Sequence, residues 1–476
     1  MKKNRKWCLP LVFSALIAAC TVDAYNVSTS KSEVEENKPL SETWSAIPED
    51  HYCLNVVYYV PADMDTLNLW KKRLSGLTLN TQTFFKDNML RYKYDKTFGL
   101  VVNDSNKNYI QMSYIKSKRE TAKMKLVDME DMANEVMEYF STHPSEKQSN
   151  HFLVYMPTYT GSFINTVYLD PSGKGIPDHA ITFAGCDAEK FDSKFLKSAR
   201  GRAAYLKSLG QVMYEQLYSF LIAGNNGLVT DSRFSLGGNI GNTGSGIFNY
   251  TKYYDIPDKI TLTPIDAFWL NEIQVFNKKS DNHAYVPVES VEIEDVTFSW
   301  LDAEESIFER DSLFVECTFR TSDDLVGAVM YLDPWRSTTE VEHKDPNKRT
   351  DGDAMGYLKN SSEFEKVGDD VYKVSFLLLW SEMNPKNINY VPGTTDPSLS
   401  NVDDPSTPYI ETNQICKAEM RFRFIGEGGM AYPQPGVSLK GDWDSNFRWY
   451  FQIRRYKTSV MTIDVSVPDI VERYTE

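Results

Sequence analysis

The sequence predicts an α/β (α+β) domain followed by an all-β domain, and three observations support this order. Strand-like and helix-like segments alternate between residues 54 and 156, which is typical of a mixed sheet covered by helices. The longest helical signal follows at residues 192–224. From about residue 288 the pattern changes to seven short β runs separated by turn-rich loops, which is typical of packed sheets.

The elements of the first domain follow from the spacing of apolar residues. Residues 54–60 form a continuous apolar run that Pro61 closes, as in a buried strand. From Leu67 to Met89, apolar residues recur at nearly 3.6-residue spacing, which predicts a helix. The remaining elements before the long helical segment are two strands at 97–102 and 109–115, a helix at 127–140 and a strand at 151–156.

The helical segment 192–224 opens at Asp192-Ser193, which fits an N-cap. A glycine-rich loop at 237–246 follows it, and this loop lacks the Gly-Lys-Ser/Thr ending of a phosphate-binding loop. We therefore expect no nucleotide cofactor. One more helix at 263–274 closes the domain, whose limits we place at residues 50–286.

Residues 287–476 are expected to form the all-β domain. Seven short strands in this range resemble those of an immunoglobulin-like sandwich. Trp335 precedes a charged loop and is the best candidate for an exposed ring that stacks on a glycan, although core packing is the alternative for every tryptophan here. The expected strands are 291–300, 312–320, 325–332, 370–380, 415–425, 446–456 and 458–467.

The composition is that of a folded, acidic protein of two or three domains. Of its 476 residues, 41% are hydrophobic and 13% are aromatic, which is more apolar mass than a disordered chain carries. Acidic residues outnumber basic ones by 66 to 51, so the formal net charge is −15. Because such a surface repels phosphate backbones, no nucleic acid is expected as a partner.

Residues 1–19 have the pattern of a secretory signal peptide. Basic residues precede an apolar run from Trp7 to Ala19, which is shorter than the ~20 residues that cross a bilayer as a helix. The run ends in Ile17-Ala18-Ala19-Cys20, which resembles the bacterial lipobox. This resemblance implies that Cys20 is acylated and anchors the protein to a membrane, the outer membrane of a Gram-negative cell.

Residues 20–49 are polar and serine- and glutamate-rich, so we expect a flexible tether. An acidic stretch after the lipidated cysteine resembles the signal that sends lipoproteins of some gut bacteria to the cell surface. A merely solvated linker is the alternative.

Four cysteines remain beyond the signal peptide and Cys20. An even number in an exported chain permits two disulfides, and pairing within each half of the chain is the simplest arrangement. Four buried free thiols are the alternative. The residues concerned are Cys53, Cys186, Cys317 and Cys416.

The helical segment carries a glutamate, Glu215, flanked by Tyr214 and Tyr218, which are four residues apart. With Leu209-Gly210 before it and Asn225-Asn226 after it, this frame resembles the H-E-x-x-H-x-x-G-x-x-H helix of metzincin-type zinc peptidases. In that motif the histidines bind zinc and the glutamate polarises the attacking water.

Laid on the motif, this sequence lacks all three histidines. Tyr214 and Tyr218 stand for the first two, and Gly224 stands for the third. Leu221 replaces the glycine at which the family's helix ends, so the helix is expected to continue to Gly224. Gly237 stands where the family has the methionine of its methionine turn.

The resemblance therefore implies a metzincin-like fold with a degenerate catalytic site. The segment 263–271 also resembles the family's closing helix. An unrelated α/β domain with a buried amphipathic helix is the alternative. Elsewhere in the chain no two histidines lie three to five residues apart, so no local metal-binding pair exists and no bound metal is expected.

We expect a cell-surface lipoprotein that binds a protein or glycan ligand without catalysis. Two other functions stay open: an active zinc metallopeptidase with an unorthodox metal site, and glycan capture through the C-terminal sandwich alone.

Overall fold

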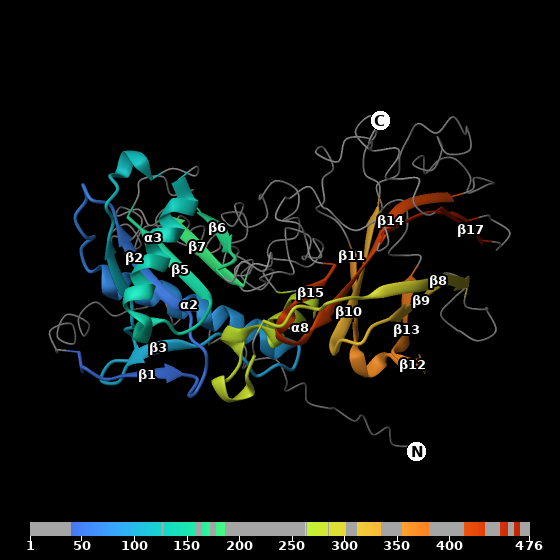
Figure 1. Cartoon of the computed structure of the whole chain (residues 1–476), viewed down its shortest axis with the longest axis horizontal. Helices are drawn as coiled ribbons and strands as arrows, with labels where there is room; N and C mark the ends of the chain where they lie inside the picture. The colour runs from blue at the N-terminus through green and yellow to red at the C-terminus, as the bar shows by residue number, and fades with distance from the viewer. Residues whose placement is uncertain are drawn as a thin grey trace, which may run out of the picture.

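The structure is a computed structural model with an α/β part (residues 40–283) followed by a pair of antiparallel sheets (residues 285–466), called here the C-terminal sheets (Figure 1). This order agrees with the prediction of an α/β domain followed by a β domain. The residues that the structure describes are 40–124, 128–157, 164–171, 178–185, 262, 264–283, 285–300, 312–334, 355–379, 414–433, 448–455 and 461–466.

The α/β part is built on a five-stranded sheet in the order β4-β2-β5-β7-β6, called here the central sheet. Four strands are parallel, and β6 pairs antiparallel to β7 at the edge, so the sheet is mixed as predicted. The strands are β2 (Asn55–Val60), β4 (Ser113–Lys116), β5 (His151–Met156), β6 (Ile164–Leu169) and β7 (His179–Gly185).

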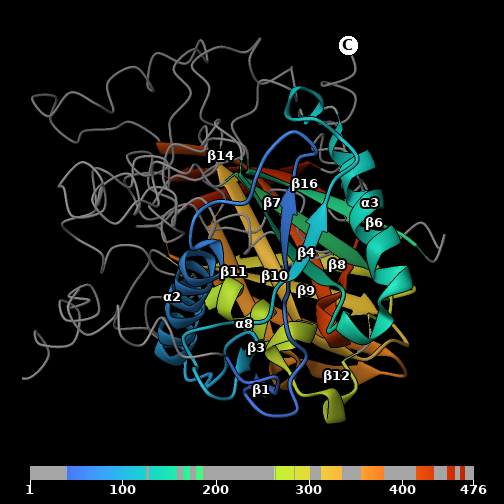
Figure 2. The same ribbon diagram turned by 90° about the vertical axis from the view of Figure 1, so that its left-hand side faces the viewer.

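Helices α2 (Trp70–Arg91) and α3 (Met129–Thr142) cover opposite faces of the central sheet (Figure 2). Side chains alternate between the two faces of a strand, so β2 supplies both layers. Tyr58 packs with the residues of α2, whereas Tyr59 packs with those of α3. This double coverage explains why the parallel strands read as unbroken apolar runs.

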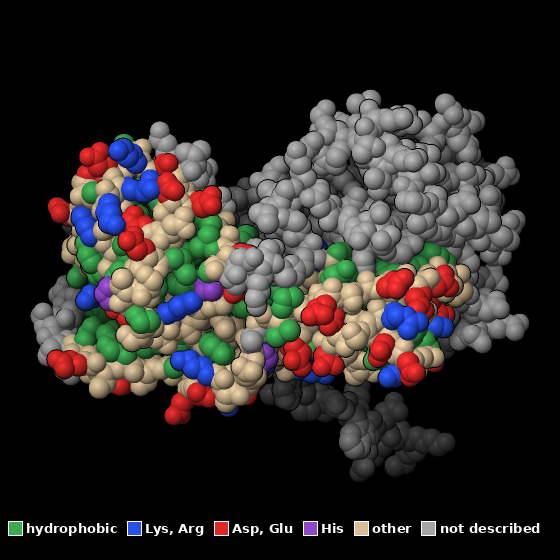
Figure 3. Space-filling view, in the orientation of Figure 1, with side chains coloured by type: hydrophobic (Ala, Val, Ile, Leu, Met, Phe, Trp, Pro, Cys, Tyr) green, Lys and Arg blue, Asp and Glu red, His purple; other side chains and the backbone are tan. Residues whose placement is uncertain are grey.

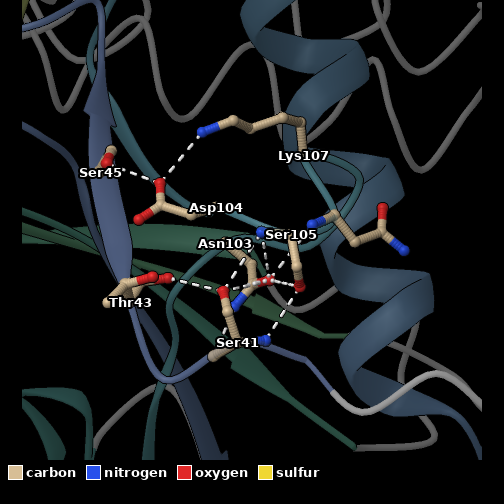
Figure 4. Close-up of polar contacts among 8 residues, drawn as sticks. Ser41, Thr43, Ser45, Asn103, Asp104, Ser105 and Lys107 are labelled. Carbon is tan, nitrogen blue, oxygen red and sulfur yellow. Dashed lines mark hydrogen bonds and ion pairs between the residues drawn. The ribbon is translucent and has the colours of Figure 1, made fainter.

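The chain enters the fold through a small separate sheet of β1 (Trp44–Ile47) and β3 (Leu100–Asn103). Figure 4 shows the polar contacts that hold it. Ser41 Oγ donates to Asn103 Oδ1 over 3.1 Å, and Asn103 Nδ2 donates to Ser41 O over 2.8 Å. Ser45 Oγ donates to Asp104 Oδ1 over 2.6 Å, and this bond contributes most to lowering the pKa of Asp104. Residue 41 is thus fixed to the body of the protein.

The C-terminal sheets are a four-stranded sheet, β12-β13-β9-β8, and a six-stranded sheet, β11-β10-β14-β16-β17 with β15 paired to β14. Each of the seven β runs expected from the sequence is a strand here. The strands are β8 (Glu292–Trp300), β9 (Ser312–Arg320), β10 (Leu325–Pro334), β11 (Met355–Asn360), β12 (Glu365–Gly368), β13 (Val371–Leu379), β14 (Gln414–Gly426), β15 (Ala431–Tyr432), β16 (Arg448–Arg455) and β17 (Met461–Ser466).

Residues 420–425 of β14 are buried on both faces of the strand. On one face, Phe424 lies 4.5 Å from Phe319 of β9 between ring centroids, so the two sheets pack against each other. The other face meets helix α8 (Pro264–Glu272), because a Cβ added at Gly327 of β10 would lie 2.7 Å from Cζ of Phe268. Gly327 pairs with Ile425 of β14, and directly opposite residues share a face.

The junction between the two parts is a continuous apolar core around Trp269 of α8. This side chain is fully buried, and its Nε1 donates a hydrogen bond of 2.7 Å to the carbonyl of Gly429. Gly429 has a φ of +80°, and a Cβ there would lie 2.6 Å from Cδ1 of Ile273, so only glycine fits. The α/β part and the C-terminal sheets therefore share one core.

On the face shown in Figure 3, acidic and basic side chains are interspersed over the described surface of both parts. Among the described helices, none combines the length and apolar character that crossing a membrane requires.

Candidate functional site

The degenerate motif belongs to a segment that starts after β7 and ends before α8. Its residues Tyr214, Glu215, Tyr218, Leu221, Gly224 and Gly237 all lie outside the described part of the chain. The predicted helix 192–224 and its expected end at Gly224 therefore stay predictions. The structure describes the two elements to which this segment is attached.

The segment begins at the carboxyl end of the central sheet. β7 is buried from His179 to Ala184 and ends at Gly185, between β5 and the antiparallel edge strand β6. In open α/β sheets, ligands bind outside the carboxyl ends of the parallel strands. The attachment of the candidate segment at this end is therefore consistent with a binding role.

The segment returns to the described fold at Leu262, which helix α2 holds by its main chain. The Leu262 amide donates to Asn88 Oδ1 over 3.2 Å, and the Tyr92 hydroxyl donates to the Leu262 carbonyl over 2.7 Å. Burial, and to a smaller extent the nearby carboxylate of Asp266, raises the pKa of Tyr92. Tyr92 is therefore a neutral hydrogen-bond donor at physiological pH.

Three buried charged side chains, which sequence reasoning did not single out, lie on α8 and β14. Asp266 of α8 is fully buried, and Arg421 and Arg423 of β14 are 2% and 1% exposed. Both arginines lie on the face of β14 that also carries Ile425 and meets α8. The alternation Arg-Phe-Arg-Phe is typical of a half-exposed strand, so its pattern alone assigns these arginines to solvent.

The described histidines are distributed over the fold rather than gathered. His51 precedes β2, His143 ends α3, His151 and His179 begin β5 and β7, and His283 follows the 3₁₀ turn η8 (Lys279–Asp281). Within the described ranges, no group of three or more His, Cys, Asp or Glu side chains is arranged to hold a metal ion. The prediction that the chain binds no metal stays a prediction, because the segment 186–261 lies outside those ranges.

Two of the four cysteines considered for disulfides are free thiols. Cys53 and Cys317 are fully buried and unpaired, which corrects the expectation of a disulfide for these two and agrees with the alternative of buried thiols. Burial raises the pKa of the Cys53 thiol to about 12 and raises that of Cys317 as well, so neither is a reactive thiolate. The side chain of Cys416, and residues Cys20, Cys186 and Trp335, lie outside the described set.

No family model and no curated protein sequence matches this chain. Among solved structures, a catalytically inactive form of OgpA from Akkermansia muciniphila, in complex with the O-glycopeptide substrate glycodrosocin, has a TM-score of 0.54 to this chain at 17% identity. The match covers 90% of this chain and 97% of that one.

Wild-type OgpA in one crystal form matches with a TM-score of 0.54 at 18% identity, over 88% of this chain and 95% of that one. A second crystal form gives 0.53 at 17% identity, over 90% and 97%. At such identities the likeness concerns the fold, and it supports a metallopeptidase-like fold for this chain.

Proposed function

We propose that this protein is a surface lipoprotein whose metzincin-like domain has lost its metal site and binds O-glycosylated peptides without cleaving them. The observation that carries this proposal is the fold-level match over 90% of the chain to OgpA, which was crystallised with an O-glycopeptide substrate. The sequence of this chain nevertheless has tyrosines and a glycine at the three positions that correspond to metal-binding histidines.

The loss of catalysis follows from the chemistry of the replacements. Tyrosine ligates a metal only as a phenolate, and its unperturbed pKa of ~10 disfavours that form at neutral pH. Glu215 would have no metal-bound water to deprotonate, and an ordinary water is a far weaker acid. A domain with these residues would lose the hydrolytic step, and we propose that it keeps the ability to bind peptides.

The proposed lipid anchor on Cys20 leaves about 20 residues before the fixed residue Ser41. An extended chain spans at most ~3.3–3.6 Å per residue, so this tether reaches up to about 70 Å. Because Ser41 is bonded to the body of the protein through Asn103, the membrane distance is set by the tether alone. This arrangement favours display of the whole fold beyond the membrane surface.

We also propose that residues 287–476 are an immunoglobulin-like sandwich and that residues 50–286 are the metzincin-like domain. The strand order supports the first assignment. If β8 is strand A of such a fold, the four-stranded sheet reads D-E-B-A and the six-stranded sheet reads C′-C-F-G, followed by the additional strand β17.

Binding without cleavage is tested with the full-length protein in detergent. Glycodrosocin and the same peptide without its sugar are titrated in parallel, and each sample is then analysed by mass spectrometry. We expect saturable binding of the glycopeptide, weaker binding of the bare peptide and no fragments. Tyr214→Ala and Tyr218→Ala should weaken binding, whereas Tyr114→Ala, at a 42% exposed residue on the far edge strand β4, should not.

The other outcomes separate the alternatives. Fragments that disappear when zinc is chelated would show an active peptidase with an unorthodox site. Binding that is lost on Trp335→Ala and unaffected at Tyr214 and Tyr218 would show glycan capture through the C-terminal sheets. Equal affinity for both peptides, or no binding, contradicts the proposal.

A further inference from the structure

Three side chains at the amino-terminal ends of β5 and β7 form a continuous hydrogen-bonded chain. Asp178 Oδ1 lies 2.6 Å from His179 Nδ1, and His179 Nε2 lies 2.7 Å from Lys147 Nζ. His179 begins β7, and Lys147 follows the 3₁₀ turn η4 (Pro144–Glu146) in the loop that leads into β5. The candidate segment 186–261 starts at the opposite end of β7, so this cluster is separate from the proposed peptide-binding site.

The chemistry of the three groups determines where the protons sit. A lysine ammonium can only donate, so the imidazole of His179 must accept at Nε2 and carry its own proton on Nδ1. That Nδ1–H then donates to the carboxylate of Asp178. Burial is the largest influence on His179 and lowers its pKa, while the hydrogen bond with Asp178 acts in the opposite direction. His179 is therefore a neutral base whose cationic form has a carboxylate beside it.

Lys147 is more exposed to solvent than His179. His179 is 7% exposed and stacks on the ring of Phe152 at 6.3 Å between centroids, whereas Lys147 is partly exposed. Burial lowers the pKa of Lys147, and the charge of Asp178 raises it to a smaller extent. Among the described residues, Asp178 is the charged group that influences the pKa of Lys147. The charged groups that influence the pKa of His179 are Asp178 and Lys147.

A nucleophile backed by a base, with a carboxylate orienting the base, is the arrangement by which proteins activate side chains for covalent chemistry. Here the nucleophile is an amine rather than a hydroxyl or thiol. Amines with a suppressed ammonium form react with carbonyl carbons. If Lys147 served only to hold the η4 loop against β7, it would not need His179 between it and Asp178. A direct ion pair between Lys147 and Asp178 would hold the loop equally well.

We propose that Lys147 is a reactive amine that forms imines with aldehydes, with His179 and Asp178 as its proton relay. His179 Nε2 takes one proton from the ammonium, and the freed nitrogen attacks the aldehyde carbon. The alkoxide takes a second proton from the nitrogen. The imidazolium then returns its proton to the hydroxyl, which leaves as water while the C=N bond forms. Ammonium and aldehyde thus give protonated imine and water, without any oxidant or reductant.

The test measures the rate at which individual lysines of the full-length protein react with a soluble aromatic aldehyde. Sodium cyanoborohydride traps the imine as a stable amine, and peptide mass spectrometry locates it. Lys118, whose side chain is 80% exposed, is the internal reference. At pH 7.5 we expect Lys147 to react several-fold faster than Lys118, because burial favours the free amine of Lys147 and His179 Nε2 is placed to accept the ammonium proton.

Variants show whether Lys147 reacts quickly because His179 and Asp178 activate it or only because it is exposed. His179→Gln and Asp178→Asn should bring the Lys147 rate down to that of Lys118, and Lys118→Arg should leave it unchanged. If His179→Gln does not fold, the pH dependence of the wild type decides: because burial lowers the pKa of Lys147, its reaction rate should level off at a lower pH than that of an ordinary exposed lysine. Equal rates for the two lysines in the wild type, or an unchanged Lys147 rate in a folded His179 or Asp178 variant, would overturn the proposal and leave a loop-holding contact only.

Discussion

Two glycines of the α/β part have opposite surroundings and so provide a matched pair of substitutions. A Cβ at Gly76, in the middle of α2, would have nothing within 4 Å. A Cβ at Gly99 would lie 2.2 Å from the carbonyl oxygen of Tyr52, where the backbone makes a parallel bridge to Cys53. Gly76 therefore lowers the stability of the helix without any steric need for glycine, whereas Gly99 must be glycine because the backbone of Tyr52 is too close for a Cβ.

We predict that Gly76→Ala stabilises the protein by about 0.5–1 kcal/mol, because alanine loses less backbone entropy in a helix. Gly99→Ala should destabilise it by about 1–3 kcal/mol through overpacking. Urea unfolding of the two variants beside the wild type measures both changes. Shifts of the same sign would show that the surroundings of one glycine are wrongly described.

Cys20 is the residue on which the proposed anchoring depends. Cys20→Ala should remove the acyl group, so the protein should move from the membrane fraction to the soluble fraction of the cells that express it. Mass spectrometry of the purified chain should show loss of the lipid mass. Retention in the membrane at an unchanged mass would rule out lipidation at this residue.

At the scale of elements, the sequence was sufficient where one periodicity dominates. The buried run at 54–60, the strand at 151–156 and the seven C-terminal β runs all correspond to strands. Helix α2 begins at Trp70, later than the apolar spacing indicated, because Leu69 has a φ of 55° and cannot continue a helix. The apolar residue Leu67 instead precedes the helix, and its amide donates to the Tyr58 hydroxyl.

Several strands were not predicted, because their sequences lack a clear strand pattern. β7 reads His-Ala-Ile-Thr-Phe-Ala-Gly, whose small residues pack in a central strand although they carry little strand propensity. β6, β11 and β12 are edge strands, each paired on one side with a single neighbouring strand. β1 adds to β3 through residues almost 60 positions apart, which no periodicity encodes.

The expected end of the degenerate helix at Gly224, rather than at position 221, gives a prediction for the candidate segment. Leu221 favours continuation of the helix to Gly224, so a histidine at 224 would lie at an intact helix end and face away from the other two. Replacing Tyr214, Tyr218 and Gly224 with histidine should therefore restore little zinc affinity. Adding Leu221→Gly should raise the affinity markedly by allowing the turn.

Zinc titration of the triple variant and the quadruple variant, with the wild type as the blank, makes the comparison. Equal affinity with and without the glycine would mean that the helix already turns at Leu221, or that the family assignment is wrong.

For the molecule as a whole, the main departure from the sequence analysis is the shared core. Sequence reasoning divided the chain at residues 286 and 287 because the periodicity changes there. It did not indicate that α8 packs on the six-stranded sheet, because contacts such as Phe268 with Gly327 leave no local pattern. The burial of Arg421 and Arg423 was not predicted for the same reason, because it depends on the element that packs on their face of β14. The chemistry of the candidate site stays a prediction from the motif, because residues 186–261 lie outside the described part of the chain.

We therefore predict that the two parts unfold together. Trp269→Ala should destabilise the full chain by about 3–5 kcal/mol, the usual range for a buried tryptophan. Trp269→Phe keeps most of the ring volume and should cost about 1 kcal/mol for the lost hydrogen bond to Gly429. Calorimetry should show one transition that moves as a unit. Two transitions, of which only one moves, would contradict a shared core.

The central claim is that a metallopeptidase-like fold has survived without its metal site. The most direct test is the zinc content of the full-length protein, purified without chelators from cells supplied with zinc and measured by elemental mass spectrometry. We predict no stoichiometric zinc, and no change in content between the wild type and Glu215→Gln. One zinc per chain, lost together with glycopeptide cleavage on chelation, would contradict the account.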